Sequence, residues 1–489
     1  MKKIFLLIAV TSFQFAVAQS DQELSDQSVN QNTIKSHIGF LASDELKGRD
    51  TPSEGQSIAA KYIESRFVEY GVELAGGMET YFQPVPMKSV KPPITGAVKI
   101  GTDEYKLIDD FFVVNEGESL IDLPMVFVDY GSADDLKKGK IKGKLVFALC
   151  GDGETQNPQA WFAISAEKRK MVMENGGLGL IELYNSPQIP WNVLIRYFNR
   201  EQTMLDMGDE SESFSHLWMN RAMDDLSILD KKKAKGSIVV PKGETRNFEV
   251  KNIVGMVEGT DPELKDEFVV YSAHYDHIGI GKADAKGDSI YNGARDNAVG
   301  TVTVLSAAQS IAKNPTRRSA LFVLFTGEEK GLLGSQGFVN NSPIPLEKLV
   351  YCFNSDNGGY NDTSLATIIG LGRTTADKMI IEACDAFGLK ATDDPAPEQG
   401  LFDRSDNVRF AAKGIPAPTF SLGFTAFDAE IGKYYHQAGD EPETLDYEYL
   451  EKFFKAYVYS CRLIGNADEA PFWLEGDKYY EKGVELYGR

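Results

Sequence analysis

The most constraining feature of this 489-residue chain is a regular alternation of apolar, strand-length runs with helix-length stretches from about residue 250 onward. The run ALFVLF at 320–325 contains no polar residue, which indicates a strand buried on both faces. Such strands, separated by helices, favour an α/β fold with a mainly parallel sheet covered by helices on both faces. We predict strands at 267–277, 320–329, 349–356 and 415–422, and helices at 297–313, 374–389 and 447–465.

Imidazole and carboxylate side chains lie where three of these predicted strands end. His274 lies near the end of the first, Glu328 and Glu329 end the second, and Asp356 ends the third. Ligand sites in open α/β sheets lie at the carboxyl ends of the strands. Imidazole nitrogens and carboxylate oxygens are the donors that hold zinc and similar cations. Two metals that share a carboxylate can bind and activate water, so the pattern predicts a peptide hydrolase.

Two further segments complete the candidate set. Asp296, in NGARDNAVG, lies between a turn and a helix start, where an aspartate is commonly an N-cap but could also bridge two cations. His436, in YYHQAGDE, is followed four residues later by Asp440, which could orient the ring. The chain has only five histidines, and three of them lie in the candidate segments.

Strand geometry assigns roles within the clusters. His274 and Asp276 are two residues apart, so their side chains face one side of the strand while His277 points to the other. We predict that His274 is a metal ligand and that Asp276 fixes its tautomer. Of the adjacent pair Glu328 and Glu329, one can bind metal while the other takes a proton from water, because a general base cannot also be a tight ligand.

The chain begins with the features of a secretory signal. Lys2 and Lys3 precede the apolar run IFLLIAV, and Ala16-Val17-Ala18 matches a small-residue cleavage site. We therefore expect export to the periplasm or the medium, with cleavage after Ala18.

Residues 94–245 differ in character from the rest of the chain. Short β-like runs are separated by Gly, Asp and Lys turns, which indicates a β-rich domain inserted into the catalytic one. Helices are expected before it, at 27–43 and 52–72. The expected organisation is a signal peptide at 1–18, a first catalytic segment at 19–93, the insert at 94–245 and a second catalytic segment at 246–489.

Composition excludes several classes of protein and site. The formal net charge is −21, so the chain lacks the basic footprint of a nucleic-acid-binding protein. No apolar run is long enough to predict a membrane span. The four cysteines form no C-x-x-C pair, which argues against a cysteine zinc site. Cys352 and Cys384 lie in apolar patterns typical of free buried thiols.

In this order and spacing, the segments AHYDH, NGARDNAVG, GEEKGLLGS, NSDN and YHQAGDE resemble zinc-dependent exopeptidases of the bacterial aminopeptidase S and glutamate carboxypeptidase superfamily. LASDELKGR at 41–49 and RSDNVRFAAKGIPA at 404–417 extend the match. The insert, with GKIKGKLVFAL and MENGGLGLIELYN, resembles a protease-associated domain. The resemblance covers nearly the whole chain after residue 18.

The resemblance implies the zinc exopeptidase fold, two zinc ions per chain, peptide substrates and a role for each matched residue. His274 and Asp356 would hold one zinc, Glu329 and His436 the other, and Asp296 would bridge them. Glu328 would be the general base, and the peptide bond between Asp296 and Asn297 would be cis. The candidate substrate-binding residues are Arg404 and Asp406, together with Arg295, which would contact substrate or pair with a site carboxylate.

An aminopeptidase acting on peptide N-termini is the leading expectation. A carboxypeptidase or dipeptidase on the same fold would need a basic residue to hold the substrate carboxylate, for which Arg404 and Arg409 are candidates. Glutaminyl cyclisation uses a related one-zinc site, and the insert and the complete ligand set argue against it. A metal-free binding module would have lost ligands that this chain retains.

Overall fold

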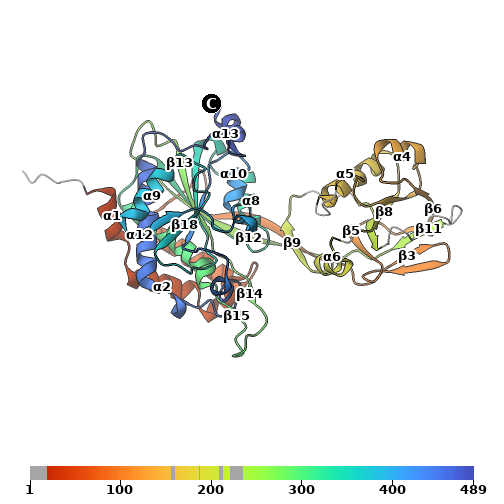
Figure 1. Ribbon diagram of the computed structural model, residues 1–489, viewed down its shortest axis with the longest axis horizontal. Helices are drawn as coiled ribbons and strands as arrows, with labels where there is room; N and C mark the ends of the chain where they lie inside the picture. The colour runs from red at the N-terminus through yellow and green to blue at the C-terminus, as the bar shows by residue number, and fades with distance from the viewer. Residues whose placement is uncertain (1–18, 156–159, 187, 209–212, 221–234) are drawn as a thin grey trace, which may run out of the picture. The chain divides into compact units, whose positions relative to one another are not determined.

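The chain forms two compact units (Figure 1). The computed structural model describes residues 19–155, 160–186, 188–208, 213–220 and 235–489. One unit contains the described residues up to Val85 together with Val250–Arg489, and the other is Pro86–Glu249. The chain passes between them within two long strands, β2 (Phe82–Lys91) and β12 (Glu244–Val257). The predicted insert, 94–245, lies inside the second unit.

The first unit is built around a mixed, mainly parallel sheet, as the sequence predicts. Its strands follow the order β19-β18-β20-β17-β13-β16-β12. The neighbours β20, β17, β13 and β16 run parallel, whereas β12 is antiparallel to β16 and β18 to β20. The bounds are β13 Phe268–His274, β16 Ser319–Phe325, β17 Leu349–Ser355, β18 Leu365–Ile369, β19 Lys390–Thr392 and β20 Thr419–Leu422.

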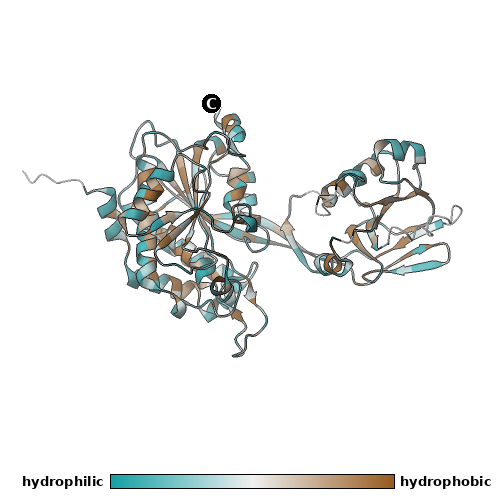
Figure 2. Ribbon diagram, in the orientation of Figure 1, coloured by the Kyte–Doolittle hydropathy of each residue, from teal (hydrophilic) through white to brown (hydrophobic). Residues whose placement is uncertain are grey.

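Hydrophobic cores lie on both faces of this sheet, and β16 contributes to each. All seven of its residues are buried. Leu321 and Val323 belong to one core, while Ala320 and Phe322 belong to the other, because successive side chains of a strand point to opposite faces. The strands are hydrophobic along their length, and polar residues gather on the outward faces of the helices (Figure 2).

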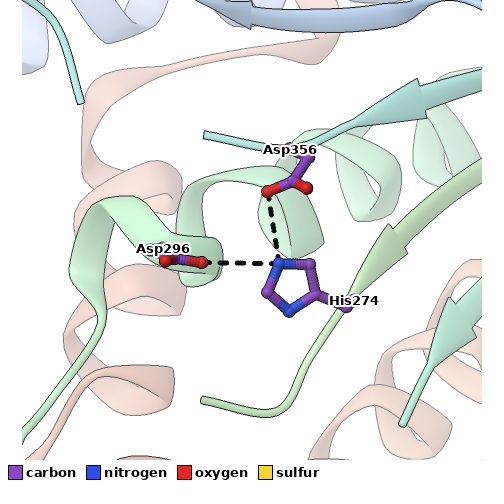
Figure 3. A group of neighbouring side chains, drawn as sticks. All are labelled: His274, Asp296 and Asp356. Atoms are coloured by element: carbon purple, nitrogen blue, oxygen red, sulfur yellow. Dashed lines mark hydrogen bonds and ion pairs between the residues drawn. The ribbon is translucent and has the colours of Figure 1, made fainter. Parts of the chain in front are cut away.

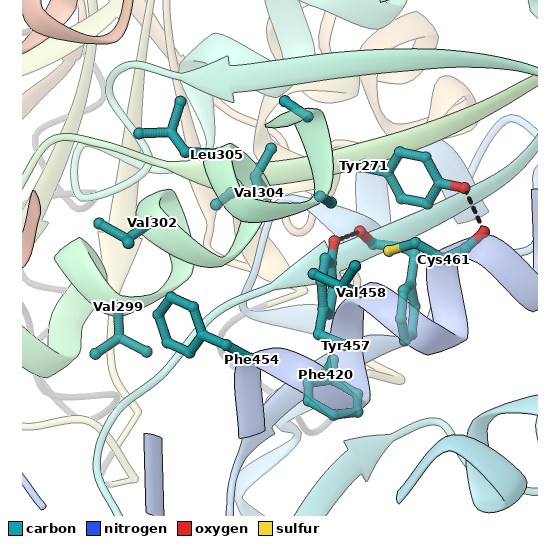
Figure 4. Close-up of a cluster of buried hydrophobic side chains, with 14 of the residues drawn as sticks. Tyr271, Val299, Val302, Val304, Leu305, Phe420, Phe454, Tyr457, Val458 and Cys461 are labelled. Atoms are coloured by element: carbon teal, nitrogen blue, oxygen red, sulfur yellow. Dashed lines mark hydrogen bonds between the residues drawn. The ribbon is translucent and has the colours of Figure 1, made fainter. Parts of the chain in front are cut away.

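Helices cover the two faces and close these cores. One core includes residues of α2, α3, α7, α9 and α12, and the other includes residues of α8, α10 and α13. Figure 4 shows part of the first, where Tyr457 and Cys461 of α12 pack near Tyr271 of β13. The bounds are α2 Gln31–Leu41, α3 Glu54–Tyr70, α7 Gly300–Lys313, α8 Leu333–Asn340, α9 Asp377–Ala386, α10 Asn407–Ala411, α12 Tyr447–Asn466 and α13 Tyr480–Tyr487.

The two helices expected before the insert are present as α2 and α3. In α3, Ser53 caps the first turn by accepting a hydrogen bond from the backbone N–H of Gln56. The helix ends at Gly71, whose φ of 74° is a left-handed conformation that glycine adopts without strain. A further helix, α1 (Asp21–Ser28), precedes them and was not predicted.

The second unit is β-rich, as predicted. Its eight-stranded sheet has the order β4-β3-β11-β6-β7-β8-β10-β5. The β-like runs expected in the insert appear as β6, β7 and β8, and a helix, α5, precedes β8. The bounds are β3 Ala97–Ile100, β4 Asp103–Lys106, β5 Phe111–Asn115, β6 Leu120–Phe127, β7 Leu145–Leu149, β8 Gly179–Tyr184, β10 His216–Asn220, β11 Lys235–Val239, α4 Ala133–Gly139, α5 Trp161–Glu174 and α6 Trp191–Phe198.

A fully buried group of polar side chains joins α5 to the neighbouring strands β8 and β10 of this second sheet. Glu182 of β8 binds Lys168 of α5 and accepts hydrogen bonds from Trp218 Nε1 at 2.8 Å and from Ser165. Its Oε2 also lies 2.9 Å from Nε2 of His216. Each of these residues is at most 2% exposed. Because a buried carboxylate is costly unless it is paired, these contacts are what allow Glu182 to lie in the core.

Two further expectations concern cysteines and membranes. The four cysteines, all within the described part of the chain, are buried and form no disulfide. Among the described helices, none is both long enough and apolar enough to cross a membrane.

Candidate metal centre and active site

The candidate residues meet at the carboxyl edge of the first sheet. His274 is the last residue of β13 and pairs in register with Phe325, the last residue of β16. Glu328 and Glu329 follow three and four residues later, and Asp356 follows directly on β17. The shared edge therefore brings together side chains that are far apart in the sequence.

One group of donors forms around His274 (Figure 3). Its Nε2 lies 3.2 Å from Oδ1 of Asp356 and 3.4 Å from Oδ1 of Asp296. Zinc binds nitrogen and oxygen at about 2.0–2.2 Å, and tetrahedral geometry then separates two ligand atoms by roughly 3.3–3.6 Å. The three side chains therefore fit a zinc ion.

A second group forms around His436. Its Nε2 lies 3.2 Å from Oδ2 of Asp296 and 3.3 Å from Oε2 of Glu329, which again are close to tetrahedral ligand separations. Asp296 therefore directs one carboxylate oxygen to each group and is placed as a bridge. The peptide bond from Asp296 to Asn297 is cis, as the resemblance implies.

The electrostatics of both groups favour positive charge. Burial lowers the pKa of His436, but contacts with Asp296 and Glu329 raise it to about 10. Burial likewise opposes protonation of His274, yet Asp356 and Glu328 raise its pKa well above the ordinary value. Carboxylates that raise the pKa of adjacent imidazoles in this way create the field that holds a divalent cation.

Asp276 lies behind both His274 and Glu328. Its main-chain oxygen is 3.2 Å from His274 Nδ1, while its carboxylate lies 3.8 Å from the same nitrogen. The carboxylate also accepts hydrogen bonds from the backbone N–H of Glu328 and from the Thr51 hydroxyl, each at 3.2 Å. Burial raises the pKa of Asp276 to about 6. The residue therefore touches the predicted ligand and anchors the predicted base.

The structure corrects the expectation that His277 points away from the site. Its Nδ1 lies 2.8 Å from Oε1 of Glu329 and 3.9 Å from Oδ2 of Asp296. Strand alternation does not apply at this position, because β13 ends at His274 and the chain then turns. The backbone N–H of His277 donates to the carbonyl of Arg49, which belongs to the LASDELKGR segment.

Arg295 is not a substrate contact, and the structure favours its other predicted role of pairing with a site carboxylate. The side chain is 2% exposed, with Nη1 2.9 Å from Oδ1 of Asp440. It also hydrogen-bonds Thr444 and lies 3.7 Å from the ring centre of Tyr434. A guanidinium enclosed in this way cannot reach a peptide.

Asp440 differs from its predicted role of orienting His436. Its Oδ2 accepts the backbone N–H groups of Arg295 at 2.9 Å and Asp296 at 3.2 Å. Within the described part of the chain, its hydrogen bonds reach these residues and not His436. Asp440 therefore orients the bridging aspartate instead.

The other two candidate substrate-binding residues, Asp406 and Arg404, differ in whether they line the cavity. Asp406 is fully buried and does not reach the cavity, so the prediction that it binds substrate directly is wrong. Burial raises its pKa to about 7. Arg404 does line the cavity, with Nη2 3.5 Å from the hydroxyl oxygen of Tyr435.

The cavity beside the metal-ligand groups has a volume of about 90 Å³. Glu328 and all five predicted carboxylate and imidazole ligands line it. Burial raises the pKa of Glu328 well above the ordinary value. The remaining lining is mostly apolar and aromatic, and includes Ile369, Leu401, Phe424, Phe427, Ile431 and Tyr435.

Tyr435 is the functional candidate that sequence reasoning missed. Its ring stacks on His436, with centroids 4.1 Å apart, and it lines the cavity. The sequence feature that could have indicated it is its position in YYHQAGDE, directly before the predicted ligand His436.

The sequence profile of peptidase family M28 matches residues 252–460, which contain all five predicted metal ligands and Glu328. By this match, residues 252–460 form a segment of the peptidase family M28 type. An aminopeptidase from Aneurinibacillus sp. strain AM-1 has the same fold, with a TM-score of 0.56 at 18% identity over 92% of this chain and 97% of that one.

Curated relatives are more similar in sequence but match shorter parts of the chain. A probable leucine aminopeptidase of Arthroderma otae is 24% identical over 53% of this chain and 67% of its own length. Aminopeptidase YwaD of Bacillus subtilis is 26% identical over 41% of this chain and 42% of its own. A vacuolar membrane protease of Lachancea thermotolerans is 33% identical over 25% of this chain. The match spans only 12% of that protease's length.

Proposed function

We propose that this M28 peptidase is a two-zinc aminopeptidase that removes residues from peptide N-termini, with Glu328 as general base. The observation that carries the proposal is that Asp296 directs one carboxylate oxygen toward His274 and the other toward His436, beside one cavity. His274 and Asp356 would hold one zinc, and His436 and Glu329 the other. When bound, the zinc ions polarise the scissile carbonyl and lower the pKa of water.

The protein's own groups supply the proton transfer. Glu328 lines the cavity and would take a proton from the attacking water and pass it to the leaving amine. The hydrogen bond from its backbone N–H to Asp276 fixes its position. Tyr435 lines the same cavity, and its hydroxyl group would donate a hydrogen bond to the developing oxyanion.

The charge of the cavity supports action at the amino end of a peptide. Glu328, Glu329 and Asp356 line it together with a single guanidinium, that of Arg404. Of these carboxylates, Glu328 is the one that no zinc ion would hold, and a carboxylate in that position would stabilise a substrate ammonium group. The apolar wall suits a hydrophobic side chain on the first residue.

Arg404 is the observation that favours a second candidate, a carboxypeptidase or dipeptidase. A guanidinium can hold a substrate carboxylate through two parallel hydrogen bonds. In that case the free carboxyl group, and not the amine, would be required for cleavage.

A panel of one apolar peptide with a free N-terminus, an N-acetyl group or a C-terminal amide separates the two functions. We expect the free and amidated forms to be cleaved and the acetylated form to resist. Chelation should abolish cleavage, and added zinc should restore it. Cleavage of the acetylated but not the amidated peptide would overturn the aminopeptidase proposal.

We also propose that the chain is exported. The support is the sequence of residues 1–18, which lie outside the described residues. Helix α1 begins just after the expected cut, with Ser20 as its N-cap. N-terminal sequencing of the exported protein should begin at Gln19, and retention of residues 1–18 would contradict this.

A further inference from the structure

His277 is a buried histidine in the candidate metal centre that the predicted ligand set does not use. Its side chain is fully buried, and its Nδ1 lies 2.8 Å from Oε1 of Glu329. The other oxygen of that carboxylate, Oε2, is the one that faces His436. His277 and His436 therefore contact opposite oxygens of the same side chain.

We propose that His277 is a positioning residue, whose Nδ1–H holds Oε1 of Glu329 so that Oε2 is presented to the second zinc. This rests on the proposed two-zinc centre. Carboxylates that bind metals are themselves commonly held by outer hydrogen bonds, which fix their orientation and tune affinity.

Distances distinguish this role from direct ligation. Two ligands of one tetrahedral zinc are separated by roughly 3.3–3.6 Å, and the contacts of His436 with Asp296 and Glu329, at 3.2 and 3.3 Å, come close to this. The 2.8 Å from His277 to Glu329 is shorter and lies within the range of a hydrogen bond. Its 3.9 Å from Asp296 is longer than a ligand separation. The geometry thus places His277 behind Glu329.

The surrounding structure holds the ring in place. Its backbone N–H donates to Arg49, and the ring packs on Gly293, where an added Cβ would lie 2.6 Å from ring atoms. The ring also meets that of His436 edge-on, with centroids 5.6 Å apart. A side chain at residue 293 would displace the imidazole from Glu329.

Only one ring nitrogen of His277 is engaged. Nε2 has no hydrogen-bond partner among the residues that the structure describes. The contact with Glu329 therefore determines the tautomer and places the proton on Nδ1, where it is donated to the carboxylate. A buried histidine kept only for packing would not need to present this nitrogen to a metal-ligating side chain.

The test compares two replacements of His277 by zinc affinity and not by activity. Asn carries an amide nitrogen near the position of Nδ1, so His277→Asn keeps a donor to Glu329. His277→Leu removes it. Zinc is titrated into metal-free protein against a competing chelator, and cobalt absorption reports each site separately. His37→Leu is the control, because His37 is a buried, hydrogen-bonded histidine whose contacts are with Tyr62 and Tyr70.

We expect His277→Leu to weaken the second zinc by about 10–100-fold and to leave the first unchanged. His277→Asn and His37→Leu should stay within about threefold of the parent, a margin well below that effect. If the Leu variant fails to fold, His277→Gln replaces it, because its amide lies near Nε2 and should also lose affinity.

Two results would overturn the proposal. Unchanged affinity in His277→Leu would show that the ring only fills space, and equal loss in the Asn and Leu variants would indicate direct ligation. A parent protein that binds fewer than two zinc ions would instead refute the two-zinc centre itself, so the two failures are distinguishable.

Discussion

Replacing Asp440 by Asn should destabilise the first unit strongly, because it leaves a buried guanidinium without its counter-ion. Arg295 and Asp440 are 2% and 1% exposed. Burial raises the pKa of Asp440 even with Arg295 beside it, so the cost of desolvating the carboxylate exceeds their attraction. The intact pair therefore contributes little net stability, whereas removing one partner of such a pair costs about 3–5 kcal/mol.

The structure places the expected loss at the lower end of that range. Arg295 keeps its hydrogen bonds to Thr444 and its contact with Tyr434, and the new amide oxygen can still accept the N–H of Asp296. We expect a loss of about 3 kcal/mol in the free energy of unfolding. For a unit of this size that corresponds to a decrease in Tm of roughly 5 °C.

The assay is urea unfolding of metal-free protein followed by far-UV circular dichroism, so that altered zinc affinity does not contribute. Arg317→Gln is the control, because it removes solvent-screened ion pairs with Asp261 and Asp468 and should cost much less stability. Adding Arg295→Met to Asp440→Asn should cost less than the sum of the single changes. A loss in Asp440→Asn no larger than in the control would refute the reasoning.

Three further outcomes are expected. Glu328→Gln should retain both zinc ions and lose about 100-fold or more in kcat; near-normal turnover would remove Glu328 from the base role. Phe424→Ala should enlarge the cavity, and the ratio of kcat/KM for a leucyl substrate to that for a phenylalanyl substrate should fall by about tenfold. An unchanged ratio would show that Phe424 does not select the substrate side chain. Burial lowers the pKa of His216 in the folded protein, so near pH 6 the unfolded chain binds more protons than the folded one. The free energy of unfolding should therefore decrease as the pH falls below about 6.5. Burial raises the pKa of Glu182, but His216 and Lys168 outweigh it and lower the pKa to about 2. The contribution of Glu182 to the free energy of unfolding therefore persists to much lower pH. His216→Gln should therefore lose less stability than the parent between pH 7.5 and 5.5 in urea unfolding, whereas equal losses would exclude His216 as the source.

The parts of the fold that sequence could predict are those set by short-range patterns. Apolar runs such as 320–325 are buried on both faces and must be central strands. Their carboxyl ends then bring Glu328, Glu329 and Asp356 to one edge without further information. Asp296 and His436 lie outside the strands, and their predicted roles as ligands came from the resemblance of their segments to zinc exopeptidases.

The other features depend on contacts between distant segments. His277 lies just beyond the end of β13, where strand alternation no longer predicts direction. Arg295 precedes the bridging aspartate, yet its burial is decided by Asp440, 145 residues later. Asp406 is enclosed by packing that no local pattern reveals.

The boundaries of the second unit, Pro86–Glu249, differ from the predicted 94–245 for another reason. Strands β2 and β12 run continuously through both boundaries, so composition does not change there. The shift in character appears only at 94 and 245, inside the unit.

The central claim is that Asp296 bridges two zinc ions, and an anomalous difference map at the zinc absorption edge tests it most directly. Crystals of the zinc-loaded enzyme should show two peaks about 3.5–4 Å apart, one on either side of the Asp296 carboxylate. One peak should lie beside His274 and Asp356, the other beside His436 and Glu329. A single peak, or a pair that does not share Asp296, would contradict the account.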